Sequence, residues 1–433
     1  MWNWTRRNAG ILVRNRSLSC IPTARGMCVL PASAPAAFDV AIVGGGVSGA
    51  STAYHLAAAD PSLTVAVFEQ DPCYSRASSS LSAASIRHQY STSLNVAISL
   101  FGSDFLRRAA TTLAVDGCDP PNIGFVERGY LFLAGESGRS VLEENHAIQI
   151  AAGAKPTLLD PAGVAAAWPW MRAHDVAAAS LGGPGEGWFD AYSLLMAYRN
   201  KARSLGVSFV ADEVVKARRG ADGGVAELTT VSGAALQVGT VVNAAGGWAH
   251  RVAQMCGASL PTRPHTRCVF VFETETNTAA DCPMLIDRTG VWARPEGTKT
   301  FICGVSPPAD RDPVVDVTDD LAFDVDYALF DDIIWPALAN RAEVFEAIKV
   351  VHAWAGVYNM NPFDHNAILG YDPDVSNLIH AAGFSGHGLQ QSPAVGRGLS
   401  ELIIHGSYQT LDLSPFDYSR LLTDDPIVER NVV

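Results

Sequence analysis

The sequence predicts an α/β protein in which a Rossmann-like domain, built from separated segments, alternates with a β-rich domain. Three observations lead to this prediction. The 433 residues exceed what one hydrophobic core usually serves, so two domains are the first expectation. A strand, a glycine turn, a helix and a second strand follow one another within residues 38–68, which is the order of a βαβ unit. Antiparallel strand patterns interrupt the α/β pattern between about 258 and 350.

Apolar runs and their periodicity place the elements along the chain. Residues 38–43 and 63–68 are short apolar runs typical of buried parallel strands, and the alanine-rich stretch 47–59 between them predicts a helix. The remaining predicted helices cover 95–113, 140–152, 191–205 and 393–405, and the remaining predicted strands cover 130–133, 207–210, 236–243, 268–272, 290–294, 300–304 and 378–381.

Composition excludes several classes of protein. Apolar residues make up 48% of the chain and charged residues 17%, which excludes a disordered chain. The net charge of −13 argues against a general nucleic-acid binder. The sequence contains no run of 18 uncharged apolar residues, so no transmembrane helix is predicted. The eight Cys and 11 His form no Cys-x-x-Cys or His-x-x-x-His pair, so no metal site is expected.

Residues 1–38 differ from the rest of the chain in charge. They contain five Arg and no acidic residue, and Asp39 is the first carboxylate. An Arg-bearing, acid-free leader predicts an organelle transit peptide, and a disordered basic arm is the alternative. Scattered thiols without a pairing pattern fit a reducing compartment such as the mitochondrial matrix or the cytosol.

The strongest local signal is the stretch 44–49, Gly-Gly-Gly-Val-Ser-Gly, which satisfies G-x-G-x-x-G between a predicted strand and a predicted helix. Its glycines permit a tight turn and close approach of a pyrophosphate to the helix N-terminus. Glu69 closes the second strand 20 residues after Gly49, where a carboxylate can accept hydrogen bonds from a ribose. The alternative is a glycine-rich turn followed by a solvated Glu. The fingerprint occurs once, so one dinucleotide is expected.

Three further segments narrow the prediction by resemblance. Residues 78–90 (SSSLSAASIRHQY), 242–249 (VNAAGGWA) and 382–390 (AGFSGHGLQ) resemble the flavin-contacting segments of the D-amino-acid-oxidase-like FAD superfamily, in the same order. The resemblance implies FAD as the cofactor. Together with the fingerprint, it assigns cofactor binding to Gly44, Gly46, Val47, Ser48, Gly49, Glu69, Gln70, Ser79, Ser80, Ser82, Val214, Ala244, Ala245, Gly246, Trp248, Gly356, Gly383, Gly386, His387, Gly388, Leu389 and Gln390.

The same resemblance gives the domains their expected roles. The FAD-binding domain is expected to comprise 39–115, 180–256 and 352–412, and the substrate domain to comprise 116–179 and 257–351, followed by a C-terminal tail at 413–433.

The chain is also similar to a mitochondrial branch of this superfamily. The similarity rests on 186–190 (EGWFD), 386–391 (GHGLQQ) and 408–416 (YQTLDLSPF), and it extends over 39–433. It implies a role in the assembly of respiratory complex I, with complex I subunits or assembly intermediates as partners. The implied location is the mitochondrial matrix or the matrix surface of the inner membrane, which agrees with the leader.

The superfamily includes enzymes that resemble sarcosine oxidase, in which a C–H next to an amine nitrogen delivers hydride to the flavin. An amine or amino acid is therefore the implied small-molecule substrate. Arg87, in the segment Ile-Arg-His-Gln-Tyr, is similar to the cation that binds the substrate carboxylate, and Arg suits that role because its fork is bidentate. The alternative is an Arg paired with a structural acid or with the flavin. Tyr358 and Arg294 are further candidates for the substrate cavity, with simple packing as their alternative.

Departures from the family pattern refine these implications. Gln390 stands where sarcosine oxidases carry a lysine, so a second cation for the substrate carboxylate is missing and weaker binding of a small amino acid is expected. Ile302 stands where the oxidases carry their oxygen-activating lysine, so we expect a dehydrogenase that passes electrons to a protein or a quinone. Gly356 and Ser82 stand where relatives attach flavin through Cys or His, so FAD is expected to be non-covalent. A non-catalytic FAD-binding assembly protein for complex I is the alternative function.

Overall fold

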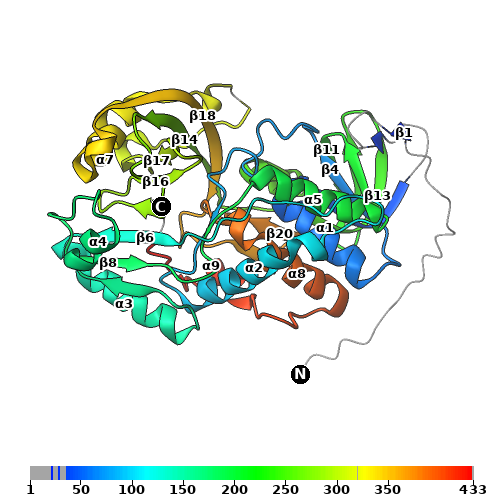
Figure 1. The fold of residues 1–433 in the computed structure, drawn as a ribbon. Helices are drawn as coiled ribbons and strands as arrows, with labels where there is room; N and C mark the ends of the chain where they lie inside the picture. The colour runs from blue at the N-terminus through cyan, green and yellow to red at the C-terminus, as the bar shows by residue number, and fades with distance from the viewer. Residues whose placement is uncertain (1–20, 23–27, 30–35, 319, 432–433) are drawn as a thin grey trace.

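The computed structural model describes residues 21–22, 28–29, 36–318 and 320–431. The predicted leader 1–38 lies almost wholly outside these residues. The described chain forms two large sheets, which lie on opposite sides of the molecule in Figure 1, and a short two-stranded ribbon. This architecture confirms the predicted α/β class with a Rossmann-like part and a β-rich part.

The first sheet has a parallel centre, as a Rossmann-like domain requires. Its strands lie in the order β1, β2, β10, β4, β3, β13, β12 and β11, and β20 and β19 extend it beside β13. The end of β13 pairs with β20 in parallel, and its beginning pairs with β12 in an antiparallel hairpin. The bounds are β1 Ile21–Pro22, β2 Cys28–Val29, β3 Ala36–Val43, β4 Val65–Glu69, β10 Ser208–Ala211, β11 Val214–Arg219, β12 Val225–Thr230, β13 Ala235–Asn243, β19 Ile368–Tyr371 and β20 Leu378–Ala382.

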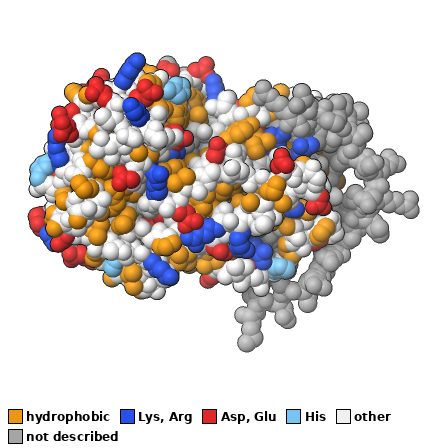
Figure 2. Space-filling view, viewed as in Figure 1, with side chains coloured by type: hydrophobic (Ala, Val, Ile, Leu, Met, Phe, Trp, Pro, Cys, Tyr) orange, Lys and Arg blue, Asp and Glu red, His pale blue; other side chains and the backbone are white. Residues whose placement is uncertain are grey.

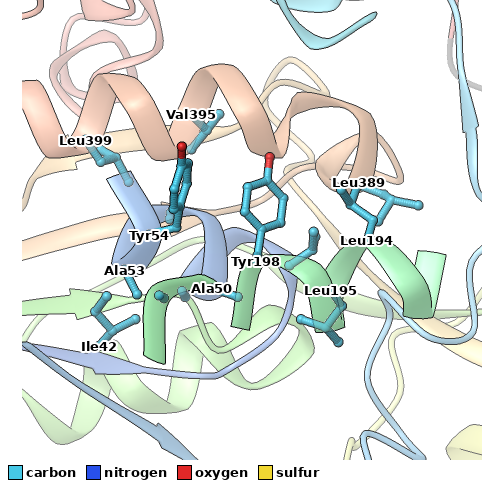
Figure 3. Close-up of a cluster of buried hydrophobic side chains, with 14 of the residues drawn as sticks. Ile42, Ala50, Ala53, Tyr54, Leu194, Leu195, Tyr198, Leu389, Val395 and Leu399 are labelled. Carbon is cyan, nitrogen blue, oxygen red and sulfur yellow. The ribbon is translucent and has the colours of Figure 1, made fainter. Parts of the chain in front are cut away.

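Helices cover one face of this sheet and bury a shared apolar core (Figure 3). The helices are α1 (Val47–Ala59), α2 (Ser93–Thr112), α5 (Ala191–Ser204) and α8 (Gly388–His405). Small residues let α1 and α8 approach closely, since a Cβ added at Gly396 would lie 2.2 Å from the Ser51 hydroxyl. Packing of this kind holds the N-terminus of α1 in a fixed place beside the sheet.

Helix α8 begins five residues before the predicted start at 393. Pro393 was expected to mark a boundary, because proline lacks the N–H that would bond to the carbonyl four residues earlier. In the structure the Ser392 hydroxyl donates to that carbonyl, on Leu389, at 2.9 Å. The helix therefore continues through Pro393, and its first turn reaches back to the loop 383–387.

The second sheet is mixed and has the order β18, β14, β17, β16, β15, β6, β8 and β7. Three buried rings, Phe272, Phe301 and Phe345, pack against one another in its core. The predicted boundary at 352 falls inside β18, which pairs with β14 over its whole length. The bounds are β6 Tyr130–Ala134, β7 Thr157–Leu159, β8 Ala178–Leu181, β14 Arg263–Thr274, β15 Met284–Ile286, β16 Trp292–Pro295, β17 Thr300–Gly304 and β18 Ile348–Met360.

Shorter elements complete the fold. They are the ribbon strands β5 Ser85–Ile86 and β9 Gly187–Trp188, the helices α3 Arg139–Ala151, α4 Pro161–Ala167, α6 Ala249–Met255, α7 Trp335–Arg341 and α9 Ser419–Leu422, and the short helical turns η1 Glu136–Gly138, η2 Gly246–Trp248, η3 Ala309–Arg311, η4 Asp320–Phe323, η5 Phe330–Ile334, η6 Glu343–Phe345 and η7 Ser414–Phe416.

The predicted C-terminal tail packs into the molecule. Leu413 and Phe416 are fully buried in the main core, and the buried Arg420 pairs with Asp364 at 2.7 Å. The segment that follows reaches the loop 87–91 and the start of α2, where Glu429 accepts from the Ser91 N–H at 2.9 Å. Residues 413–431 are therefore part of the fold.

Candidate functional site: a dinucleotide cavity with a buried arginine at one end

A cavity of about 970 Å³ runs along the carboxyl ends of the parallel strands and reaches the second sheet. This is the edge where ligands bind in open α/β sheets. Most of the residues predicted to bind the cofactor line it, and so does Tyr358. The lining predicted residues are Gly44, Gly46, Val47, Ser48, Glu69, Gln70, Ser79, Ser82, Val214, Ala244, Ala245, Gly246, Trp248, Gly386, Gly388 and Leu389.

Two glycines of the fingerprint, Gly44 and Gly49, leave no room for a side chain. Gly44 has φ +104°, and a Cβ there would lie 2.4 Å from the Ala244 carbonyl oxygen. A Cβ at Gly49 would lie 2.0 Å from the Gly44 carbonyl oxygen, so this glycine permits close packing and does not itself line the cavity. The N-cap residue of α1, Gly46, has no side chain, and the Val47 N–H donates to the Ser79 hydroxyl at 3.0 Å. A helix N-terminus whose N-cap residue is glycine leaves room for an anionic phosphate.

Glu69 is a buried carboxylate that also faces the cavity. Its Oε2 accepts from the Gly45 N–H at 2.8 Å and its Oε1 from the Asp71 N–H at 2.9 Å, and burial raises its pKa. The alternative of a solvated Glu is therefore wrong. Glu69 fixes the glycine turn while lining the space where a ribose would lie.

Five other predicted cofactor residues lie outside the large cavity: Ser80, Gly356, Gly383, His387 and Gln390. Gly356 lines a small neighbouring pocket, where a Cβ would lie 2.9 Å from Leu81. Gln390 accepts from the Arg87 N–H at 3.0 Å, and His387 contacts the Arg87 guanidinium. Gln390 and His387 therefore contact Arg87 and do not line the cavity.

The cavity has an unsatisfied donor that fits a ligand with acceptor atoms. The amide Nδ2 of Asn359 is buried, lines the cavity, and has no hydrogen-bond partner among the described residues. A buried donor of this kind costs about 1–3 kcal/mol unless a partner is present. Sequence reasoning missed Asn359, although its position next to Tyr358 could have indicated it. Ser78, Thr318 and Phe384 also line the cavity and were not predicted.

Arg87 is 3% exposed and lies behind the loop 386–388, outside the cavity lining. Its Nη2 lies 3.2 Å from His387 Nε2 and donates to the main-chain carbonyl of Asn431. Its guanidinium also lies over the ring of Tyr90, at 4.5 Å from the ring centre. Among the described residues it forms no ion pair with a carboxylate, and its Nε has no partner. The charge of Arg87 acts on the pKa of the fully buried Glu186, so an acid lies nearby although the two side chains form no direct ion pair.

His387 is held neutral in this position. Burial, and next the charge of Arg87, keep its pKa well below the ordinary value. Because Arg donates only, His387 Nε2 accepts and the ring proton is on Nδ1. That Nδ1 has no partner among the described residues. His387 therefore adds no positive charge to the site and leaves one donor free.

Tyr358 joins the cavity to the second sheet. It lines both the large cavity and the small pocket, and burial raises its pKa. The guanidinium of Arg267 lies 5.4 Å from its ring centre and is held by Asp312 at 2.7 and 2.8 Å. A Cβ at Gly386 would lie 2.4 Å from the Tyr358 ring, so glycine at 386 allows the ring to lie against the loop.

The structure does not bring Arg294 into the cavity lining. Its guanidinium donates to the Ala83 carbonyl at 3.0 and 3.2 Å, pairs with Glu296, and lies 5.5 Å from the ring centre of Trp188. These contacts hold the 78–90 segment against the second sheet. Its role in catalysis remains a prediction, as do the roles of Arg87 and Tyr358.

Besides Gln390, the positions at which the chain departs from the family pattern are Ile302, Ser82 and Gly356. Ile302 is 4% exposed in an apolar cluster with Trp292 and Val269. Ser82 and Gly356 offer no thiol or imidazole to which a flavin could be attached.

The described residues show no arrangement of three or more His, Cys, Asp or Glu that could hold a metal ion. None of the helices in this part of the chain combines the length and apolar character of a membrane span. On the face shown in Figure 2, acidic and basic side chains are interspersed among apolar ones, without a continuous basic surface.

Comparisons with known proteins agree with this geometry. Residues 39–402 match the family model described as FAD dependent oxidoreductase. The chain is 41% identical over 431 residues to FAD-dependent oxidoreductase domain-containing protein 1 of Xenopus laevis, covering 92% of this chain and 85% of that protein. It is 26% identical to human mitochondrial sarcosine dehydrogenase, covering 90% of this chain and 42% of that protein.

Solved structures show the same fold. L-proline dehydrogenase from P. horikoshii superposes with a TM-score of 0.80 at 23% identity, covering 91% of this chain and 100% of that chain. Glycine oxidase from Geobacillus kaustophilus superposes with a TM-score of 0.75 at 25% identity, covering 89% of this chain and 99% of that chain. The predicted cofactor is confirmed, because the chain matches the FAD dependent oxidoreductase family and has the glycine turn before α1 and the adjoining cavity. The chain belongs to the FAD-dependent oxidoreductase family of D-amino-acid-oxidase type.

Proposed function

We propose that this protein oxidises an amine or an N-alkylated amino acid by hydride transfer from the carbon next to nitrogen to FAD. One observation carries this proposal: Arg87 is a buried guanidinium with no carboxylate partner among the described residues, next to the loop 386–388 that lines the cavity. A buried charge without a partner costs several kcal/mol. An anionic ligand would offset that cost, and a carboxylate matches the guanidinium fork.

The residues at this end of the cavity then have distinct tasks. FAD, when bound, would accept the hydride. Arg87 holds the substrate carboxylate, and the Tyr358 ring, fixed between Gly386 and Arg267, forms the wall that orients the substrate. Burial of these groups excludes water from the reacting end. The oxidised product, an imine, leaves and hydrolyses in solution.

We further propose a dehydrogenase that passes electrons to a protein or a quinone. Ile302 supports this, because its side chain is enclosed by apolar neighbours and provides no cation to stabilise reduced oxygen. The names of two relatives, human sarcosine dehydrogenase and human dimethylglycine dehydrogenase, are consistent with this class.

Anaerobic reduction of the bound flavin tests the enzymatic proposal. Sarcosine, dimethylglycine, proline and D-amino acids are added in turn, together with dimethylamine, which has the N-methyl group but no carboxylate. We expect at least one amino acid to bleach the flavin, dimethylamine to fail, and Arg87→Met to abolish the bleaching while keeping its FAD. A flavin that stays oxidised with every carboxylate-bearing amine would contradict the proposal.

We also propose that the protein acts in mitochondria, in the assembly of respiratory complex I, with or without turnover. The Arg-bearing leader and the similarity over 39–433 support this role. The uncharged Gln390 and Ile302, and the contact of Arg87 with the chain's own Asn431 carbonyl, favour a form that keeps FAD without rapid turnover.

Loss of the gene tests the assembly role. We expect complex I content on native gels to fall and to be restored by the full chain. Rescue by Arg87→Met would show that assembly does not require turnover, and normal complex I content in the knockout would contradict the assembly role. A fluorescent protein fused after residues 1–38 would report the location, and cytosolic fluorescence would contradict it.

A further inference from the structure

The segment 427–431 is fastened beside Arg87, behind the loop 386–388. Its main anchor is Glu429, which is 1% exposed. Glu429 Oε1 accepts from the Ser91 N–H at 2.9 Å and from the Ser91 hydroxyl at 2.8 Å, and Oε2 accepts from Asn95 Nδ2 at 3.0 Å. These donors lie at the N-terminus of α2, where the helix dipole favours a carboxylate. Helix α2 therefore fixes the position of the segment.

Asn431 is the part of the segment that reaches Arg87. Its N–H donates to Glu429 Oε1 at 3.0 Å, its Nδ2 donates to the Gln89 carbonyl at 3.1 Å, and its Oδ1 accepts from Asn145 Nδ2 at 3.2 Å. With these three contacts in place, its main-chain carbonyl accepts from Arg87 Nη2.

This contact occupies the nitrogen that carboxylate binding needs. Nη2 has two N–H groups, of which one points to His387 Nε2 and the other to the Asn431 carbonyl. A guanidinium grips a carboxylate either through Nε and Nη2 or through Nη1 and Nη2, so both bidentate modes use Nη2. A carboxylate can bind in either mode only if the Asn431 carbonyl, or His387, gives up its bond.

We propose that the segment 427–431 occupies the anion subsite of Arg87 and that a carboxylate ligand binds there by displacing the Asn431 carbonyl. The segment then determines how tightly carboxylates bind, which rests on the proposed role of Arg87. The displaced carbonyl is replaced by a charged acceptor, so the exchange favours a carboxylate over a neutral ligand. It also loosens the chain around the exposed Arg430.

Acetate titration of the FAD-loaded full chain tests this proposal, with the visible flavin spectrum as the readout and chloride at equal ionic strength as the reference. Glu429→Gln replaces an acceptor oxygen with a donor facing the Ser91 and Asn95 donors, and it should bind acetate at least tenfold more tightly than the unaltered chain. A chain that ends at Pro426 should bind as tightly as Glu429→Gln. Val428→Ala is the matched control in the same segment, since the Val428 side chain is 50% exposed, and its acetate affinity should not change.

Trypsin cleavage after Arg430 gives a second readout that does not depend on turnover. We expect acetate to accelerate this cleavage in the unaltered chain, because the segment is released. Equal acetate affinities in the unaltered chain, Glu429→Gln and the shortened chain would overturn the displacement and leave the Arg87 site standing. If acetate binds to none of the three, the carboxylate role of Arg87 fails, and the displacement fails with it.

Discussion

The cavity end beside α1 is walled by backbone, whereas the end beside Tyr358 is walled by side chains that already contact one another. At the first end, Gly44 and Gly46 come from one short turn, and α1 begins at a glycine N-cap. Behind the second end, Arg87 is already engaged by His387 and Asn431, which lie 300 and 344 residues away in sequence. The comparison teaches that the cofactor end is ready for its ligand, while the substrate end must exchange internal contacts for substrate contacts.

The largest expected effect lies at the cofactor end. Gly46→Trp should abolish FAD binding, because the indole would fill the space in front of α1 while the backbone there, at φ −61°, accepts any side chain. Flavin absorbance of the purified protein measures this. Gly46→Ala is the control, since its Cβ would meet only the Ser79 hydroxyl, at 3.3 Å. A yellow Gly46→Trp protein would contradict the assignment of this end to the pyrophosphate.

At the substrate end, Arg87→Met should reduce the rate of flavin reduction by amino acids about 30-fold or more while FAD content is kept. Removing one partner of a buried, hydrogen-bonded charge pair costs about 2–5 kcal/mol. Stopped-flow reduction measures the rate, and the surface substitution Arg139→Met serves as the control. An Arg87→Met protein that reduces at the ordinary rate would show that the guanidinium is structural.

The pH dependence of stability that Glu186 causes tests whether water reaches the interior beside Arg87. Glu186 is fully buried beside Gln89, His88 and Arg87, and burial raises its pKa from 4.5 to about 8. Between these two values the folded state keeps a proton that the unfolded state releases, so stability should fall as pH rises, by ~1.4 kcal/mol per pH unit. Glu186→Gln has no such proton and should lose this dependence.

Urea unfolding of both proteins at pH 5.5 and 7.5 measures the difference. The free energy of unfolding of the unaltered chain, relative to Glu186→Gln, should drop by about 3 kcal/mol between these pH values. Burial lowers the pKa of His88, which lies 3.7 Å from Glu186, to about 4, so Glu186→Gln is also measured with His88→Gln in place to separate the two titrations. Equal pH dependence in the two proteins would mean that water reaches Glu186.

The smallest expected effect returns to the cofactor end. Ser79→Ala should weaken FAD binding by about 2–13-fold, because a hydroxyl hydrogen bond contributes about 0.5–1.5 kcal/mol. Flavin fluorescence titration of the apoprotein measures the affinity. Ser80→Ala is a neighbouring control, since the Ser80 hydroxyl lies outside the cavity lining and has no partner among the described residues. Equal losses in both variants would contradict the placement of Ser79.

The sequence alone determined the cofactor end. Residues 38–69 contain strand, glycine turn, helix and Glu69 within a short stretch, and local sterics allow only one arrangement of such a turn. The continuation of α8 through Pro393 was missed, because it depends on a hydroxyl bond that hydropathy does not show.

Tertiary structure alone decided the substrate end. Arg87 was identified by resemblance, but its partners His387 and Asn431 come from distant parts of the chain. The packing of 413–431, predicted as a tail, depends on long-range contacts such as Arg420 with Asp364 and Glu429 with Ser91. A local pattern fixes a backbone turn because each residue constrains its neighbours, whereas side chains meet across a cavity only when the whole fold has brought them together.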